Sequence, residues 1–117
     1  MKANDNSEPW PWPDSLDGIV AAPLSHQVLL ENDRVRVLDV VIEPGAKEPP
    51  HTHKLPGVFI VIAPTRLRYF GAAGELVREY MAPTEPRWFG PEPLHAVENI
   101  DSARYRAIRI ELKDNSN

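Results

Sequence analysis

The chain has 117 residues, of which 42% are hydrophobic and 26% are charged, and its formal net charge is −4. This composition is typical of one globular domain and argues against a disordered or membrane-spanning chain. Lysine and arginine are mixed with acidic residues and form no basic stripe, which argues against a nucleic-acid partner. Because cysteine is absent, any bound metal must have nitrogen and oxygen ligands.

Residues 1–15 are polar except for a Pro-Trp-Pro-Trp-Pro run at 9–13. Proline keeps such a segment extended and semi-rigid. We expect an arm whose tryptophans pack on the same subunit, and the alternative is an arm laid across a second subunit, since exposed tryptophans are typical of interfaces. The first ten residues contain no apolar run suited to a signal peptide, and no later run is long enough to span a membrane. The expected location is therefore the cytoplasm.

Thirteen prolines and six glycines interrupt the chain too often for long helices. The runs between them alternate in polarity or are rich in branched residues, as in strands. Many short strands with regularly spaced turns favour a closed barrel or a sandwich. We expect this domain to cover 16–113, followed by a polar tail at 114–117. The predicted strands are 27–30, 35–42, 58–63, 67–70, 76–80, 95–99 and 104–112.

The last predicted strand, 104–112, alternates with a period of two, so that successive side chains face opposite sides of the sheet. A half-buried strand normally turns its apolar side chains towards the interior. The predicted interior set is Ile108, Ile110 and Leu112, and the predicted solvent-facing set is Arg109 and Glu111.

The histidines are the candidate metal ligands. His51 and His53 form a His-x-His pair shortly after Gly45, and on a strand such residues point the same way about 7 Å apart. An isolated pair of this kind is more often a pair of surface histidines, but His95 begins a second strand-like segment after a turn rich in proline and glycine. His26 has no partner at ligand spacing. We expect it to face solvent or to cap a turn, and its replacement by alanine would then leave the metal content unchanged.

The two segments resemble the two cupin motifs. Gly45, His51 and His53 match the first motif, in which glycine and five further residues precede His-x-His, with a glutamate three or four residues later. His95 and Asn99 are similar to the end of the second motif, a histidine followed four residues later by asparagine. The resemblance covers about residues 30–112 and implies an all-β double-stranded β-helix barrel of the jelly-roll type. It also implies one divalent metal ion bound by His51, His53 and His95.

The sequence departs from the first motif at its glutamate, which would fall at Gly57 or Val58. The chain therefore resembles the cupins with three-histidine sites, among them the acetylacetone-cleaving dioxygenases. The cupin plan places Val58 and Ile60 in the pocket wall and Arg87 near its rim, where Arg87 would bind a substrate carboxylate or simply be solvated. Glu98 is the other expected catalytic residue. Regular alternation turns it outward, and a β-bulge would be needed to direct it to the metal.

Three neutral imidazoles leave other positions on an ion open, as a catalytic site requires. Because imidazoles do not offset the charge of the metal, the expected ligand is a small anionic, oxygen-bearing molecule. The favoured function is an Fe(II) dioxygenase, while Zn, Mn and Ni also suit these ligands. The alternatives are a Zn or Mn hydrolase or isomerase, and a metal-loaded cupin that binds or senses a ligand without turnover. A homodimer is expected, because a small barrel gains from covering its exposed edge strands.

Overall fold

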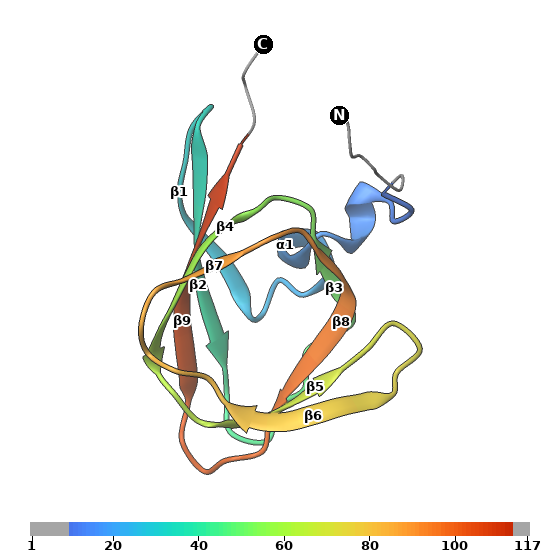
Figure 1. Cartoon of the computed structure of the whole chain (residues 1–117), viewed down its shortest axis with the longest axis vertical. Helices are drawn as coiled ribbons and strands as arrows, with labels where there is room; N and C mark the ends of the chain where they lie inside the picture. Colours follow the sequence, from blue (N-terminus) through green and yellow to red (C-terminus); the bar gives the residue numbers. More distant parts are fainter. Residues whose placement is uncertain (1–9, 114–117) are drawn as a thin grey trace.

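The computed structural model describes residues 10–113, which form two antiparallel sheets that face each other across the interior (Figure 1). The order of strands is β1-β2-β9-β4-β7 in the five-stranded sheet and β3-β8-β5-β6 in the four-stranded sheet. The mostly-β architecture predicted from the sequence is therefore observed. The strands are β1 (His26–Glu31), β2 (Val35–Ile42), β3 (His51–His53), β4 (Gly57–Ala63), β5 (Arg66–Phe70), β6 (Leu76–Met81), β7 (Arg87–Phe89), β8 (Glu92–Asn99) and β9 (Tyr105–Leu112).

Each predicted strand is present, with ends that differ by at most three residues. β3 and β7 are not among the predicted strands, because three residues are too few for an alternating pattern. A 3-10 turn, η1 (Asp14–Leu16), and a short helix, α1 (Gly18–Ala21), precede β1 and were also not predicted. No helix in the described range 10–113 is long and apolar enough to cross a membrane. Residues 1–9 of the predicted arm and the tail at 114–117 lie outside the described residues. Trp10 and Trp12 are described, with ring centroids 4.9 Å apart, and the packing of the arm on its own subunit stays a prediction.

The hydrophobic core occupies one end of the space between the sheets. β2 and β9 pair so that Val40 lies opposite Ala107 and Ile42 opposite Tyr105, and all four side chains are buried. Towards the other end of the same two strands the inner face becomes charged. The buried core consists of Leu38, Val40, Ile42, Val61, Leu67, Tyr105 and Ala107.

The predicted orientation of β9 is wrong. Arg109 and Glu111 are buried at 5% and 0% exposure, whereas Ile108, Ile110 and Leu112 are only partly buried and lie on the other face. A charged side chain is tolerated inside a protein when an opposite charge and hydrogen bonds satisfy it. Both inward charges of β9 lie within 4 Å of an opposite charge, and the rule that apolar side chains face inward therefore fails for this strand.

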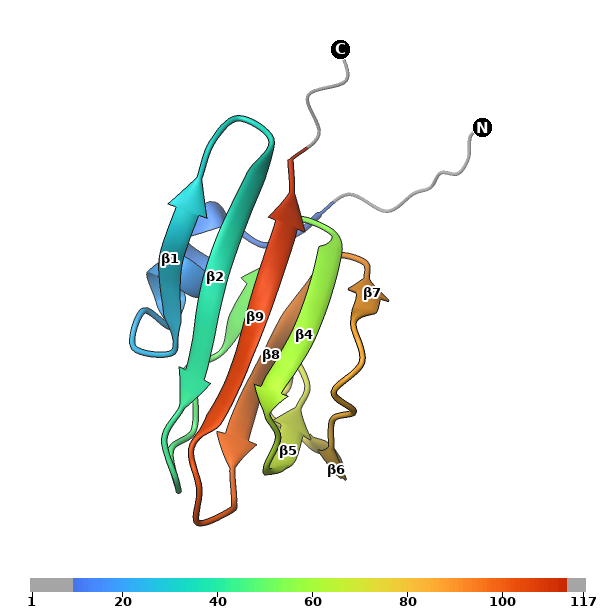
Figure 2. The ribbon, with the colours of Figure 1, turned by 90° about the vertical axis from the view of Figure 1, so that its left-hand side faces the viewer.

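The outer face of the five-stranded sheet carries the apolar side chains instead. β9 lies between β2 and β4 in the middle of this sheet (Figure 2). Side chains directly opposite each other on neighbouring strands pack together and stabilise a sheet. One row of such neighbours crosses all five strands and consists of Leu30, Val37, Ile110, Val58 and Trp88.

The homodimer expected from the exposed edge strands stays a prediction.

The start of β4 shows why the motif glutamate is missing. A Cβ atom on Gly57 would overlap the carbonyl oxygen of Ile110 on β9, so no side chain fits at this position. Val58 faces outward, opposite Ile110 and Trp88. A ligand to an interior metal ion cannot come from either position without a change in the path of β4.

We predict that Gly57→Ala destabilises the protein by about 3 kcal/mol or more, because the added methyl group forces β4 away from β9. Urea denaturation followed by circular dichroism measures this change. Gly90→Ala is the matched control, since a Cβ atom there meets nothing within 4 Å, and it should change the stability by less than about 1 kcal/mol. Equal stabilities of the two variants would contradict the described approach of β4 to β9.

Candidate metal centre

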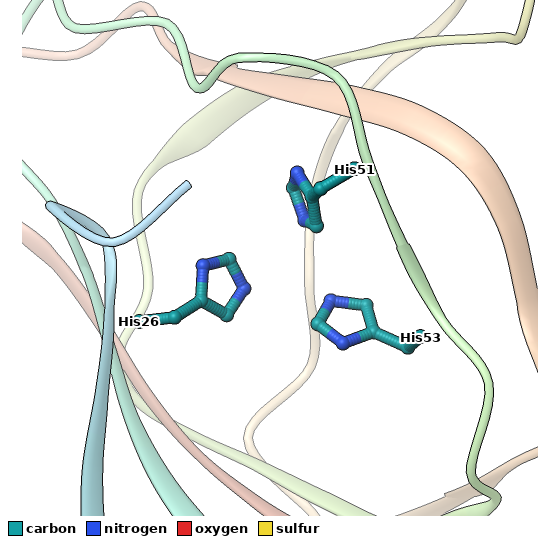
Figure 3. Close-up of side chains that lie close together, drawn as sticks. All are labelled: His26, His51 and His53. Carbon is teal, nitrogen blue, oxygen red and sulfur yellow. The ribbon is translucent and has the colours of Figure 1, made fainter. Parts of the chain in front are cut away.

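The four histidines of the chain come together in the interior, between the two sheets. His51 lies directly opposite His95 in the β3–β8 pairing, and their ring centroids are 4.4 Å apart. The ring of His26 is 4.6 Å from that of His51 and 5.1 Å from that of His53. Figure 3 shows these last three rings directed towards a common space. The predicted ligands His51, His53 and His95 are thus brought together, and His26 joins them.

His26 is the main difference from the sequence prediction, which placed it in solvent or at a turn. Its side chain is buried, with 5% exposure for the residue. β1 pairs with β2 so that His26 lies opposite Val40, whose side chain faces the core, and neighbours in this register share a face. The main chain of Gly18 in α1 packs against the histidines, because a Cβ atom on Gly18 would lie 2.8 Å from Cε1 of His53.

His51 and His95 are oriented by the same kind of local hydrogen bond. The Nδ1 atom of each donates a hydrogen bond to the carbonyl oxygen of the proline two residues earlier, at 2.9 Å to Pro49 and 2.7 Å to Pro93. A carbonyl oxygen can only accept a hydrogen bond, so Nδ1 carries the proton of each neutral ring. The Nε2 atom therefore has a free lone pair that can bind a metal ion.

The other two rings are held through Nδ1 as well. Nδ1 of His53 donates to Oε2 of Glu111 at 3.1 Å, and Nδ1 of His26 lies 3.1 Å from the carbonyl oxygen of Ala22. Histidines that bind metals usually have such a partner on the second nitrogen. Burial lowers the pKa of all four rings, that of His26 to about 3. The neutral form, which binds metals, is favoured in each case.

Two carboxylates lie beside the imidazoles. Glu92 accepts a hydrogen bond from the hydroxyl group of Tyr69 at 2.7 Å, and its Oε2 atom is 3.4 Å from Nε2 of His95. Oε1 of Glu48 is 3.8 Å from Nε2 of His51. Burial raises the pKa of Glu48. Burial also opposes the ionisation of Glu92, but electrostatic interactions with His95 and with the Arg109 guanidinium hold the pKa of Glu92 below its usual range.

Neither glutamate was predicted to lie close to the metal, although the sequence contains a signal for both. Glu-Pro-x-His occurs twice, at 48–51 and at 92–95. In each copy the proline carbonyl orients the histidine and the glutamate lies within 4 Å of its ring. The repeated tetrapeptide therefore places a carboxylate and an imidazole together at two points of the site.

These donors form two overlapping groups, each of which could hold a metal ion, and His53 belongs to both. One ligand atom from each of His26, His51 and His53 lies within 4.8 Å of the others, and the same holds for His53, Glu92 and His95. Nitrogen ligands bind at about 2.0–2.1 Å, which separates two ligands on one ion by roughly 3–4 Å, so small side-chain movements would complete the site. A nitrogen-rich set of this kind suits Zn, Fe, Ni and Cu.

The histidines lie at the base of a cavity of about 730 Å³. Arg87 is among its lining residues, whereas Glu98 lies opposite Arg68 on β5 and does not line it. The expected pocket positions of Val58 and Ile60 are wrong, because both side chains point to the outer face with Ile110 and Ile108. The aromatic side chains that line the cavity are Phe59, Tyr69, Tyr80, Phe89 and Tyr105.

Neither the protein-family models nor the curated proteins include a match to this sequence. Solved structures do match. A cupin domain from Bordetella pertussis Tohama I is 21% identical, with a TM-score of 0.68 over 76% of this chain and 92% of that one. An RmlC-like cupin with a double-stranded β-helix fold from Methanocaldococcus jannaschii is 15% identical, with a TM-score of 0.59 over 75% and 78% of the two chains.

This chain has the cupin fold. The double-stranded β-helix implied by the two motifs is confirmed. The DMSP lyase DddQ from Ruegeria pomeroyi DSS-3 is also similar, at 16% identity and a TM-score of 0.52 over 74% of this chain and 42% of that one. Within this cupin barrel, His26 comes from outside both motifs and adds an imidazole to a site that lacks the motif glutamate.

We predict that His26→Ala weakens zinc binding by more than about 100-fold, because the change removes a metal ligand. Loss of a residue that only hydrogen-bonds to a ligand weakens binding by roughly 10- to 100-fold. Competition with a chelator, together with elemental analysis, measures the affinity and the metal content. The control is Gln27→Ala, a change at the exposed neighbouring position on β1, which should leave both unaltered. Unchanged zinc affinity in His26→Ala would remove His26 from the site.

Proposed function

We propose that this cupin is a mononuclear metal enzyme, and that with Fe(II) it is a dioxygenase for a small, chelating, anionic molecule. The observation that carries the proposal is that all four clustered imidazoles have a hydrogen-bond partner at Nδ1. Each is held through Nδ1, which leaves Nε2 of His26, His51, His53 and His95 available for one ion. Four nitrogen ligands leave two positions on a six-coordinate ion, as a chelating substrate or a substrate with dioxygen requires. The bound ion would supply the redox chemistry.

The residues around the histidines would orient the substrate and keep water out. The ring of Tyr69 stacks on that of His95 with an interplanar angle of 2° and a centroid distance of 5.2 Å, which fixes the plane of this ligand. The guanidinium carbon of Arg78 lies 4.9 Å and 4.7 Å from the ring centroids of Tyr69 and Tyr80. These contacts place a positive charge in the aromatic wall, where it favours an anionic substrate.

The volume and lining of the cavity suit a small molecule. Pockets of 300–1,000 Å³ with an apolar wall and a few polar groups are typical of small-molecule sites, and this cavity of about 730 Å³ combines aromatic side chains with histidines and arginines. The similar lyase from Ruegeria pomeroyi supports an enzymatic use of the fold. An activity like that of the acetylacetone-cleaving dioxygenases is part of this proposal.

A second candidate function is a Zn- or Mn-dependent hydrolase or isomerase. It is favoured by Glu48 and Glu92, whose carboxylates lie 3.8 Å and 3.4 Å from Nε2 atoms of the cluster. A carboxylate at this distance from the ligands could accept a proton from a substrate or from water. This candidate predicts turnover with a redox-inert metal and no consumption of dioxygen.

We predict that the Fe(II)-loaded protein consumes dioxygen with at least one of acetylacetone, quercetin and cysteine, and that chelation of the metal abolishes this activity. An oxygen electrode and product analysis by mass spectrometry measure it. His95→Ala should lose both the metal and the activity, whereas Arg106→Gln should retain both, because Arg106 is on the opposite face of β9 and pairs with Asp39.

The metal content of protein purified without added metal separates the candidate functions. Iron with oxygen uptake supports the dioxygenase. Zinc or manganese with turnover under nitrogen supports the second candidate. Tight binding of these compounds to the metal-loaded protein without any turnover would contradict an enzymatic function and favour a binding or sensing protein.

A further inference from the structure

Arg109 on β9 has an unusual environment. It is 5% exposed and lines the cavity, and among the residues that the structure describes its Nη2 atom is the buried side-chain nitrogen or oxygen without a hydrogen-bond partner. A buried donor on a charged group that lacks a partner is costly. An orphaned donor of this kind at a cavity wall indicates an acceptor that comes from a ligand.

The rest of the guanidinium group is fixed in place. Nε lies 3.3 Å from Oε2 of Glu111, and Nη1 lies 3.3 Å from Oε1 of Glu92. The ring of Phe89 covers the group, with its centroid 3.7 Å from the guanidinium carbon. The ion pairs and the stacking therefore use Nε, Nη1 and a face of the group. They leave Nη2 as the nitrogen without a partner, and a small movement of the cavity wall would let a bound molecule reach it.

Both carboxylates that hold Arg109 also contact the histidine cluster. Glu111 accepts a hydrogen bond from His53, and Glu92 lies 3.4 Å from Nε2 of His95. The guanidinium group is thus linked to two proposed metal ligands through one carboxylate each. A molecule bound to the ion would lie beside Arg109, within the same cavity.

We propose that Nη2 of Arg109 binds a carboxylate oxygen of the substrate, which makes the substrate a small carboxylate with a second oxygen donor next to the carboxylate group. This inference rests on the proposed metal centre. Among the chelating anions of the proposed function, the enolate of a β-diketone would place both of its oxygens on the ion and would have no uncoordinated oxygen for Nη2, so the inference favours carboxylates over β-diketones. A 2-oxo or 2-hydroxy acid chelates through its oxo or hydroxyl oxygen and one carboxylate oxygen, and its other carboxylate oxygen is free to accept the hydrogen bond.

The test compares pyruvate with pyruvamide, which has nearly the same shape but carries no charge. Isothermal titration of the zinc-loaded protein avoids redox turnover. We expect wild type to bind pyruvate roughly 10- to 100-fold more tightly than pyruvamide, the size of effect that a charge-assisted hydrogen bond produces. The carboxylate oxygen on the zinc ion contributes to this preference in every variant. Arg109→Lys keeps a positive charge for Glu92 and Glu111 but removes the forked donor, and should reduce the preference by about 5-fold or more relative to wild type.

Two matched variants test whether the effect belongs to Arg109. Arg106→Lys changes an arginine on the same strand that faces away from the cavity, and it should keep the full preference for pyruvate. Arg87→Lys changes another arginine that lines the cavity. Loss of the preference in Arg87→Lys and its retention in Arg109→Lys would overturn the inference and assign carboxylate recognition to Arg87.

A crystal structure of the zinc-loaded wild type with pyruvate gives a second readout that does not depend on the folding of any variant. A carboxylate oxygen within about 3 Å of Nη2 supports the inference, and a carboxylate directed elsewhere overturns it. Wild type that binds no zinc would contradict the proposed metal centre. Wild type that binds zinc but shows no preference for pyruvate would overturn only the role of Arg109.

Discussion

The polar end of the barrel depends on one buried carboxylate, that of Glu111. Its Oε1 accepts a hydrogen bond from Nε of Arg36 at 2.8 Å, and its Oε2 accepts one from His53 at 3.1 Å and lies 3.3 Å from Nε of Arg109. Burial acts to raise the pKa of Glu111, and the two arginines act to lower it. This residue joins β9 and β2 in one sheet to β3 in the other. The same interactions therefore hold the sheets together and orient a proposed metal ligand.

This arrangement divides the interior into two parts. At one end, Ile42 and Tyr105 close a small apolar core. At the other end, the inner faces of β2 and β9 carry Arg36, Arg109 and Glu111, and the histidines lie beside them. Buried charges are costly unless they are fully paired, and such networks are often found where function requires them. We therefore attribute the buried charges at one end of the barrel to the proposed metal centre, and the apolar side chains at the other end to the stability of the fold.

The sequence was sufficient to predict seven of the nine strands of the described residues, the barrel, and that three of the histidines lie together. Spacing along one strand accounts for His51 and His53, whereas the barrel and His95 followed from the resemblance to the cupin motifs. His51 and His53 are two residues apart, and His95 begins the region that a second motif matches. His26 could not be found in this way, since its position depends on the register between β1 and β2. The position of Glu48 could not be predicted from alternation, because the chain before His51 is not a regular strand. Alternation gave the wrong orientation for β9, where charged residues face inward.

The central claim is that one ion is bound by Nε2 atoms of the histidine cluster, and anomalous diffraction from crystals of the zinc-loaded protein tests it most directly. We expect one strong peak per chain, about 2.0–2.1 Å from Nε2 of His26, His51, His53 and His95. A zinc peak at binding distance from Nδ1 atoms would contradict the hydrogen bonds that we assign to these atoms. A peak on the chain's surface, or at Glu48 and Glu92 without the imidazoles, would contradict the proposed metal centre.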